Sequence, residues 1–130
     1  MGLDNGICIK RKSASKEALL QFDEEWRSRN DYDLEVAYWR KCWNVRDIIL
    51  DILHVPFDND SETKMNIEDV IAVIAALKRL NEKNYTERGG CIWGWKDFKR
   101  IQRGNLRALH RLVKLMKKDS SLEVYFYDSW

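Results

Sequence analysis

The feature that most constrains the fold is the separation of charged and apolar residues along residues 96–118 of this 130-residue chain. At the 100° rotation per residue of an α-helix, seven basic residues fall on one side of this segment and apolar residues fall on the other. We therefore predict a helix from about Trp95 to Lys118 that packs on a core and presents cations outward. The basic residues are Lys96, Arg100, Arg103, Arg107, Arg111, Lys114 and Lys118, and the apolar ones are Phe98, Ile101, Leu109, Leu112 and Met116.

The charge of this segment has two interpretations. Residues 96–118 hold nine basic residues and one acid, Asp97, which gives +8, whereas the rest holds fourteen basic and twenty acidic residues, which gives −6. Like charges in one row repel, so either the face is simply solvated or relieved by acids elsewhere in the fold, or it binds an anionic partner such as nucleic acid. The candidate binding residues are Arg100, Arg103, Arg107 and Arg111, and we expect their head groups to be accessible.

Two short segments at the ends of the chain have the alternation of β-strands. Gly6–Lys12 places Ile7 and Ile9 on one face, and 122–127 alternates apolar and polar residues. Isolated strands of this length do not persist in water. We therefore predict that the two ends pair antiparallel, with Ile7 and Ile9 sharing a face with Val124 or Phe126.

The middle of the chain is predicted to be helical. Ser15 caps a first helix that carries Ala18 to Trp26, residues 34–54 have the pattern of one continuous, largely buried helix, and Asn66 caps another through Leu80. Residues 81–94 are expected to be a connection. The predicted fold is a single α+β domain over residues 1–130, mainly helical, with three or four helices and a short two-stranded antiparallel sheet formed by the chain ends.

The predicted helix over residues 34–54 carries a second candidate site. In that helix Glu35, Trp39 and Arg46 lie within the apolar side, with Tyr38 beside them, so ionisable groups stand where burial is expected. Eleven residues of helix separate Glu35 from Arg46 by ~16 Å, so each needs a partner from another element. The four residues are either parts of buried ion pairs or the lining of a polar pocket walled by Trp39 and Trp43.

Motifs of known chemistry are incomplete in this sequence. Residues 89–96 have a G-x-x-x-x-G spacing, but Trp95 stands at the lysine position of a phosphate-binding loop, and this excludes that loop. In residues 58–69, Thr63 replaces the glycine that a calcium-binding loop requires. The two histidines are not at ligand spacing, so we predict no metal site, no cofactor and no catalytic residue.

The cysteines and the hydropathy of the sequence indicate the cellular compartment of the protein. Cys8, Cys42 and Cys91 are odd in number and scattered, so we expect reduced thiols rather than a disulfide framework or a zinc site. No run approaches the ~18 apolar residues that span a bilayer, and the N-terminus lacks the features of a secretory signal. We therefore expect a cytoplasmic protein with no membrane partner.

Three stretches spread along the chain form a set: the opening Met1-Gly2-Leu3-Asp4, the central 35–41 (Glu-Val-Ala-Tyr-Trp-Arg-Lys) and the closing 125–130 (Tyr-Phe-Tyr-Asp-Ser-Trp). They resemble a family of small proteins of tailed bacteriophages and prophages, to which no function is assigned. Many members have a histidine near Arg46, which this chain lacks. The resemblance implies a phage-type setting in a bacterial host and no catalytic activity.

Three functions stay open at this point. The leading expectation is a non-enzymatic phage or prophage accessory protein that binds a host protein or an anionic partner. The first alternative is nucleic-acid binding through residues 96–118, which a basic surface not neutralised by acids would favour. The second alternative is a small-molecule or enzyme site around Glu35, Tyr38, Trp39 and Arg46, which a cavity reaching both Glu35 and Arg46 would favour.

Overall fold

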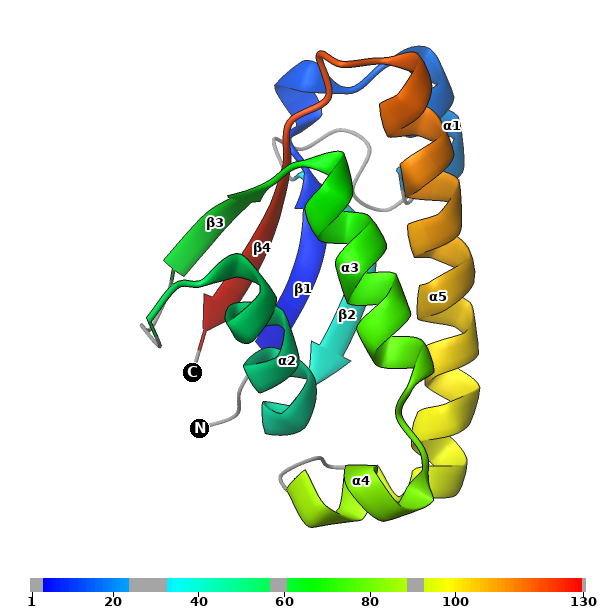
Figure 1. The fold of residues 1–130 in the computed structure, drawn as a ribbon. Coiled ribbons are helices and arrows are strands. Elements are labelled where there is room, and N and C mark those ends of the chain that lie inside the picture. Colours follow the sequence, from blue (N-terminus) through cyan, green and yellow to red (C-terminus); the bar gives the residue numbers. More distant parts are fainter. Residues whose placement is uncertain (1–3, 24–32, 57–60, 89–92, 130) are drawn as a thin grey trace.

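A computed structural model describes residues 4–23, 33–56, 61–88 and 93–129, in which helices pack on one face of a β-sheet (Figure 1). Within these residues the sheet has four antiparallel strands in the order β2-β1-β4-β3, and there are five α-helices. The expected two-stranded sheet with three or four helices is therefore wrong, although the fold is α+β. The elements are β1 Asp4–Ile9, the 3-10 turn η1 Arg11–Ser13, α1 Lys16–Phe22, β2 Leu34–Arg40, α2 Trp43–Leu53, β3 Ser61–Met65, α3 Ile67–Lys78, α4 Glu82–Arg88, α5 Trp95–Lys118 and β4 Val124–Ser129.

The two ends of the chain pair with each other at the centre of the sheet. β1 runs antiparallel to β4, with Ile7 opposite Phe126 and Ile9 opposite Val124. Residues in register project from the same face of a sheet, and all four of these side chains are buried. The predicted pairing of the chain ends is confirmed, but within a larger sheet than we expected.

The largest correction concerns residues 34–54, which we expected to form one helix. Leu34–Arg40 instead forms β2 beside β1, and α2 begins only at Trp43. Lys41, with a φ of 52°, takes the left-handed conformation between the two elements. The register of β1 against β2 shifts once, as at a β-bulge. An extra residue in a strand changes the face on which the next side chains lie, so the apolar residues of β2 fall three apart, as in a helix.

Two further elements were missed. The edge strand β3 pairs with β4, although no strand was predicted over its residues. The helix α4 lies within the predicted connection, and Asn81 and Asn84 exchange hydrogen bonds at its start: each side-chain oxygen accepts from the other's backbone N–H, at 3.0 and 2.7 Å. Reciprocal bonds of this kind satisfy N–H groups that a helix start leaves unpaired, which stabilises even a short helix.

The other predicted helices are present, although α1 and α3 end earlier than expected. Ser15 accepts a hydrogen bond from the backbone of Ala18 and so caps α1. The predicted continuation of this helix is wrong, because α1 ends at Phe22 and the backbone of Asp23 is extended; Trp26 lies outside the described residues. Asn66 and Asp69 form a capping box at the start of α3. The predicted bounds of α5 are confirmed.

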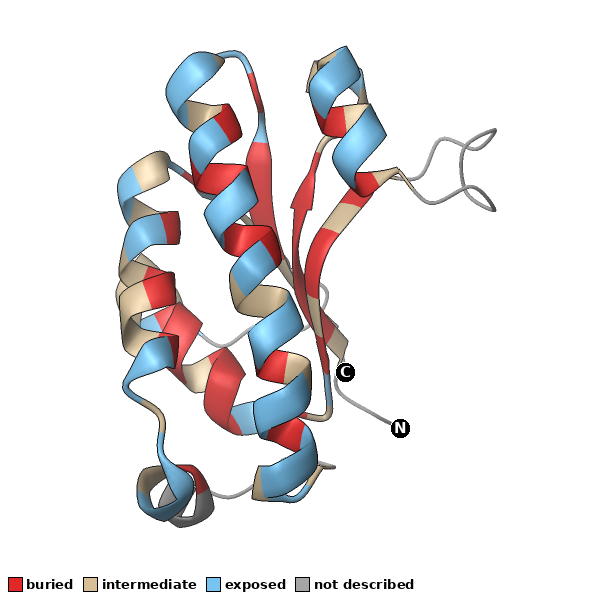
Figure 2. Ribbon diagram, turned by 90° about the vertical axis from the view of Figure 1, so that its right-hand side faces the viewer, coloured by how far each residue is buried: buried red, intermediate tan, exposed pale blue. Residues whose placement is uncertain are grey.

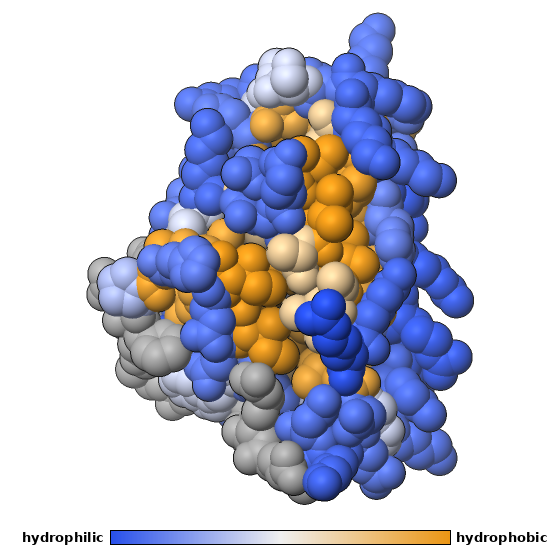
Figure 3. Space-filling view, viewed as in Figure 1, coloured by the Kyte–Doolittle hydropathy of each residue, from blue (hydrophilic) through white to orange (hydrophobic). Residues whose placement is uncertain are grey.

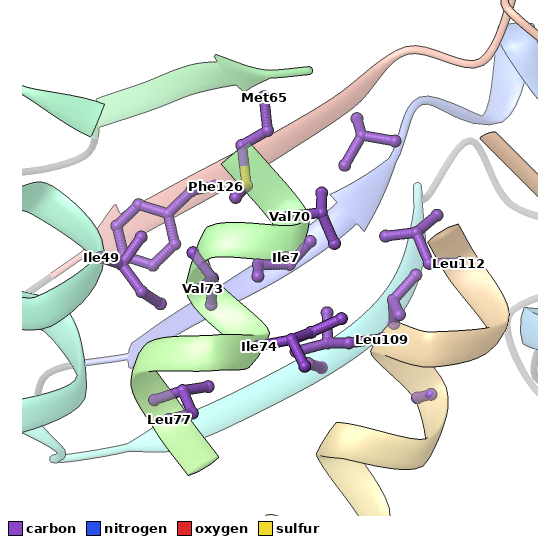
Figure 4. Packing of buried hydrophobic residues seen from close by; sticks show 14 of the residues in the cluster. Ile7, Ile49, Met65, Val70, Val73, Ile74, Leu77, Leu109, Leu112 and Phe126 are labelled. Atoms are coloured by element: carbon purple, nitrogen blue, oxygen red, sulfur yellow. The ribbon is translucent and has the colours of Figure 1, made fainter. Parts of the chain in front are cut away.

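The core lies between the sheet and the helices α2, α3 and α5. Every residue of β1 from Asn5 to Ile9 is buried. Figure 4 shows side chains from these helices, among them Ile49, Val73 and Leu109, directed toward the strands. In Figure 2 the buried residues of the helices lie on their inner sides and the exposed ones on their outer sides. Each large aliphatic side chain buried in this way contributes about 1.5–3 kcal/mol, so this core is the main source of stability.

The cysteines also required a correction. Cys42 is disulfide-bonded, whereas the thiol of Cys8 is buried in β1. The expectation of reduced thiols is therefore wrong for Cys42. Spacing along the chain could not show this, because a disulfide depends on which segments the fold brings together.

Candidate functional site

The first predicted site is the outward side of α5. We call the side chains of its seven basic residues the cationic face. All of them are exposed, so the predicted accessibility of the four arginines is confirmed. The 24 residues of α5 extend over ~36 Å, and in Figure 3 hydrophilic side chains project along the right-hand edge, where Figure 1 places this helix. The cationic face consists of Lys96, Arg100, Arg103, Arg107, Arg111, Lys114 and Lys118.

Acidic neighbours of the cationic face are few within the described part of the fold. Arg100 lies 3.6 Å from Asp97 one turn earlier, and Lys118 lies 3.4 Å from Glu17 of α1. All four side chains are exposed, and such pairs contribute about 0–1 kcal/mol. No acidic group of the described residues lies within 4.0 Å of the other five basic side chains. Five of the seven basic side chains therefore form no ion pair with an acid of the described residues.

The opposite side of α5 fixes the direction in which the cationic face points. Asn105 donates from Nδ2 to the backbone oxygen of Tyr38 in β2, at 3.0 Å, and Gln102 accepts from Trp39 Nε1 at 3.2 Å. These bonds lie among buried apolar side chains of α5, including Leu109. Helix α5 thus covers the outer edge of β2, and the basic side chains of α5 point away from the core.

The second predicted site is divided by the sheet. Tyr38 is in register with Gly6 and Glu35 with Cys8, whereas Trp39 is in register with Asn5. Successive residues of β1 project from opposite faces, so Tyr38 and Glu35 lie on the open face and Trp39 on the face that the helices cover. Arg46 is on α2, within the helix layer. The four residues therefore do not line one cavity.

Arg46 belongs to a buried ion pair on the helix side. Its Nε donates to Oδ2 of Asp128 in β4 at 2.6 Å, and the two side chains are 4% and 0% exposed. The ring centre of Trp43 lies 5.3 Å from the guanidinium carbon. The prediction that Arg46 is buried and bonded to another element is confirmed. Beside Asp128 in register lies Asn5, whose two amide atoms are buried without a hydrogen-bond partner among the described residues.

The open face of the sheet carries three tyrosines, and each donates its hydroxyl to a carboxylate. Glu35 receives one of these bonds from β4 and is half-buried rather than mostly buried, so only the predicted partner from another element is confirmed. The sequence pattern that could have indicated this face is the alternation of Tyr125 and Tyr127 with the core residue Phe126. The bonds are Tyr38 to Asp4 at 2.5 Å, Tyr125 to Asp33 at 2.7 Å and Tyr127 to Glu35 at 3.3 Å.

These tyrosines stay protonated at neutral pH. Burial, together with the hydrogen bond to Asp4, raises the pKa of Tyr38 to about 12. Burial likewise raises the pKa of Tyr125 and of Tyr127 above the ordinary value. The ring of Tyr127 lies across β1, because a Cβ added to Gly6 would stand 2.8 Å from it. The hydroxyls therefore act as hydrogen-bond donors that hold carboxylates in place.

A shallow pocket of about 240 Å³ adjoins this open face, and two of its charged side chains, Lys10 and Glu62, pair with each other. Lys10 donates to Glu62 at 2.8 Å, and this bond raises the pKa of Lys10. In the described ranges, no three His, Cys, Asp or Glu side chains come close enough together to hold a metal ion. The pocket is lined by Lys10, Glu62, Lys64, Glu123, Val124 and Tyr125.

Comparisons with protein-family models, with curated proteins and with solved structures found no match to this chain. None of the helices in the described part of the chain is both long enough and apolar enough to cross a membrane.

Proposed function

We propose that the protein is a non-enzymatic binding protein that takes an anionic partner, nucleic acid, on the cationic face of α5. The observation that carries this proposal is that five of the seven basic side chains have no acidic neighbour in the described fold. Like charges three and four residues apart on a helix repel, and this repulsion destabilises the free protein. A partner that supplies negative charge along the helix relieves it.

The spacing of the cationic face supports a polyanion rather than a small anion. Successive members lie three or four residues apart, which is ~4.5–6 Å along the helix axis. A row of phosphates can be neutralised by such a row of cations, and each neutralised phosphate releases counterions into solution. Arginine suits this role because its planar guanidinium bonds phosphate oxygens in pairs.

The small-molecule alternative has less support. It required one cavity that reaches both Glu35 and Arg46, and the sheet separates these two residues. Arg46 is already committed to Asp128, and Glu35 accepts from Tyr127. Both groups are used to hold the fold together, which is the structural interpretation that the sequence left open.

The setting of this function is part of the proposal. The resemblance to tailed-phage and prophage proteins supports the cytoplasm of a bacterial host, where nucleic acid of both phage and host is accessible. A host protein with an acidic surface is the other partner that the sequence left open. The experiment below separates the two, because a protein partner does not require binding to nucleic acid.

The test is a titration of labelled 20-base-pair DNA with the full-length protein at several salt concentrations, followed by fluorescence anisotropy. We expect binding at ~50 mM salt that weakens steeply as salt rises, since the electrostatic contribution is strongest at low salt. The variant Arg103→Gln/Arg107→Gln should bind more weakly and flatten the salt slope by about 0.9 units for each lost phosphate contact.

A matched control removes the same charge elsewhere. Lys78→Gln/Arg79→Gln lowers the net charge equally at two exposed positions at the end of α3. We expect this control to keep the salt slope of the wild type, because its cations lie off α5. Equal slopes for all three proteins, or no binding to single- or double-stranded nucleic acid at ~50 mM salt, would refute the proposed function.

A further inference from the structure

Gly104 stands in the middle of α5 without an internal reason to be glycine. It is exposed, and a Cβ built on it would meet no atom within 4 Å. Its backbone is helical, so no left-handed conformation requires a glycine here. Glycine in a helix interior is less stable than almost any other residue, because it loses the most backbone freedom on folding. The fold itself therefore gains nothing from this residue.

The neighbours of Gly104 on the helix surface are arginines. Arg100, Arg107 and Arg111 lie four residues before it and three and seven residues after it, which places them on the same side of the helix. Gly104 thus forms a notch at the edge of the row of guanidinium groups, about 20° beyond Arg111 around the helix axis. Glycine is the residue that lets another molecule approach a backbone closely. A notch flanked by cations fits a negatively charged chain that touches the helix backbone at this point.

The shape of the cationic face favours a duplex over a single strand. With Lys99 and Lys117 included, the cations span an arc of about 120° around the helix. The described, exposed side of α5 carries no Phe, Tyr or Trp on which unpaired bases could stack, and such stacking platforms are typical of single-strand binding. The ring of Trp95, at the start of α5, packs against Tyr85 and Phe98.

B-form DNA fits this arc. A helix with its side chains is ~10–12 Å across, close to the ~12 Å width of the major groove. With α5 in that groove, the cations in the middle of the arc face the base edges. The cations at the two ends of the arc, which we call its flanks, face the phosphates of the two DNA strands that border the groove. Arg100, Gly104 and Arg111 lie on one flank. The major groove of duplex RNA is too narrow to admit a helix in this way.

We propose that α5 binds duplex DNA along the major groove, and that Gly104 is the point at which one sugar-phosphate strand approaches the helix backbone most closely. This inference rests on the proposed function, because it names the class of nucleic acid and a positioning residue for the same face. Arg100, Arg107 and Arg111 hold the strand on either side of the notch. Arg111 is oriented in part by the ring of Phe22, whose centre lies 5.4 Å from its guanidinium carbon.

The test replaces Gly104→Gln, which fills the notch without changing any charge. We expect the thermal midpoint to rise, because a helix former replaces glycine, while the affinity for a 20-base-pair DNA falls about tenfold. Gly104→Ala should raise the midpoint as well and weaken binding less. A purely structural role cannot produce a protein that is more stable and yet binds more weakly.

The control is Ala75→Gln, which adds the same side chain to α3 outside the cationic face, and it should leave affinity unchanged. The wild type should also bind duplex DNA more tightly than a 20-nucleotide single strand or a 20-base-pair RNA. Equal affinity of Gly104→Gln and wild type, or equal or tighter binding of the single strand or the RNA, overturns this inference and leaves the proposed function standing. Absence of binding to every nucleic acid overturns both.

Discussion

Two basic regions of this chain differ in how many of their cations have acidic neighbours. Residues 10–12 are three consecutive cations at the end of β1, and each has an acidic neighbour from another segment. On the cationic face of α5, acidic neighbours among the described residues reach only two of seven cations. The neighbours in the first region are Glu62 at 2.8 Å from Lys10, Asp23 at 2.6 Å from Arg11 and Glu123 at 3.7 Å from Lys12.

The difference follows from where the two regions lie in the fold. Residues 10–12 follow the central strand of the sheet, and neighbouring segments bring acids toward them. The cationic face lies on the outward side of a helix whose inner side is buried (Figure 2), and it meets α1 at Arg111 and Lys118. A run of basic residues therefore indicates a binding surface only when the fold supplies no acids to meet it. The net charge of +2 conceals this contrast, because it sums both regions.

The largest expected effect is at the most deeply paired cation, Arg46. Arg46→Met leaves Asp128 buried without its charge partner, and breaking a buried pair in this way costs ~3–5 kcal/mol. Chemical denaturation monitored by tryptophan fluorescence measures the loss. Adding Asp128→Leu removes the second charge and should recover part of the stability. A loss of unfolding free energy within ~0.5 kcal/mol, which is typical of surface positions, would show that Arg46 and Asp128 do not form a buried ion pair.

Stability should fall at alkaline pH through two tyrosines, Tyr38 on the open face of the sheet and Tyr85 in α4. The pKa of Tyr38 and that of Tyr85 are raised by burial to about 12, so the unfolded chain loses these protons at lower pH than the folded one does. Stability is therefore complete below about pH 10 and falls as pH rises toward 12. Denaturation midpoints between pH 8 and 12, together with the tyrosinate absorbance, measure this. A constant midpoint to pH 12 would contradict the burial of these hydroxyls.

A smaller effect compares one cation from each region directly. Arg11 makes a two-pronged bond to Asp23, and both side chains are largely buried, so Arg11→Gln should cost about 1–2 kcal/mol. Arg107→Gln should change stability by less than ~0.5 kcal/mol, as at an ordinary exposed position. Urea denaturation of the two variants gives the comparison, and equal losses would erase the distinction between the regions.

The sequence predicted well those elements whose signals are local. The periodicity of 96–118 identified α5, the capping residue Asn66 identified the start of α3, and the alternation near the chain ends identified β1 and β4. The exposure of the candidate arginines followed from the periodicity of 96–118, and the burial of Arg46 followed from the periodicity of the part of 34–54 that forms α2. In each case the pattern of apolar and polar residues matches the burial of the side chains in the fold.

The rest depended on information that the pattern does not contain. The β2 strand resembles a helix because its bulge places Leu34 and Ala37 three apart on one face, and no Gly or Pro marks the turn at Lys41. The edge strand β3 buries Met65 and otherwise looks like a polar loop. Consequently the sequence indicated that Glu35 and Arg46 each need a partner from another element, but it did not identify that partner. The partners, Tyr127 and Asp128, lie more than eighty residues away along the chain.

The central claim is that the cationic face is an unneutralised, self-repelling row in the free protein. The measurement that tests it most directly is the difference in unfolding free energy between wild type and Arg103→Gln/Arg107→Gln at ~20 mM and ~500 mM salt. We expect the variant to be about 0.5 kcal/mol more stable at low salt, because like pairs at i,i+3 and i,i+4 are removed, and equal to the wild type at high salt, where repulsion is screened. A variant that is less stable at low salt, with the loss disappearing at high salt, would mean that acids within the fold already pair with these arginines and would contradict the claim.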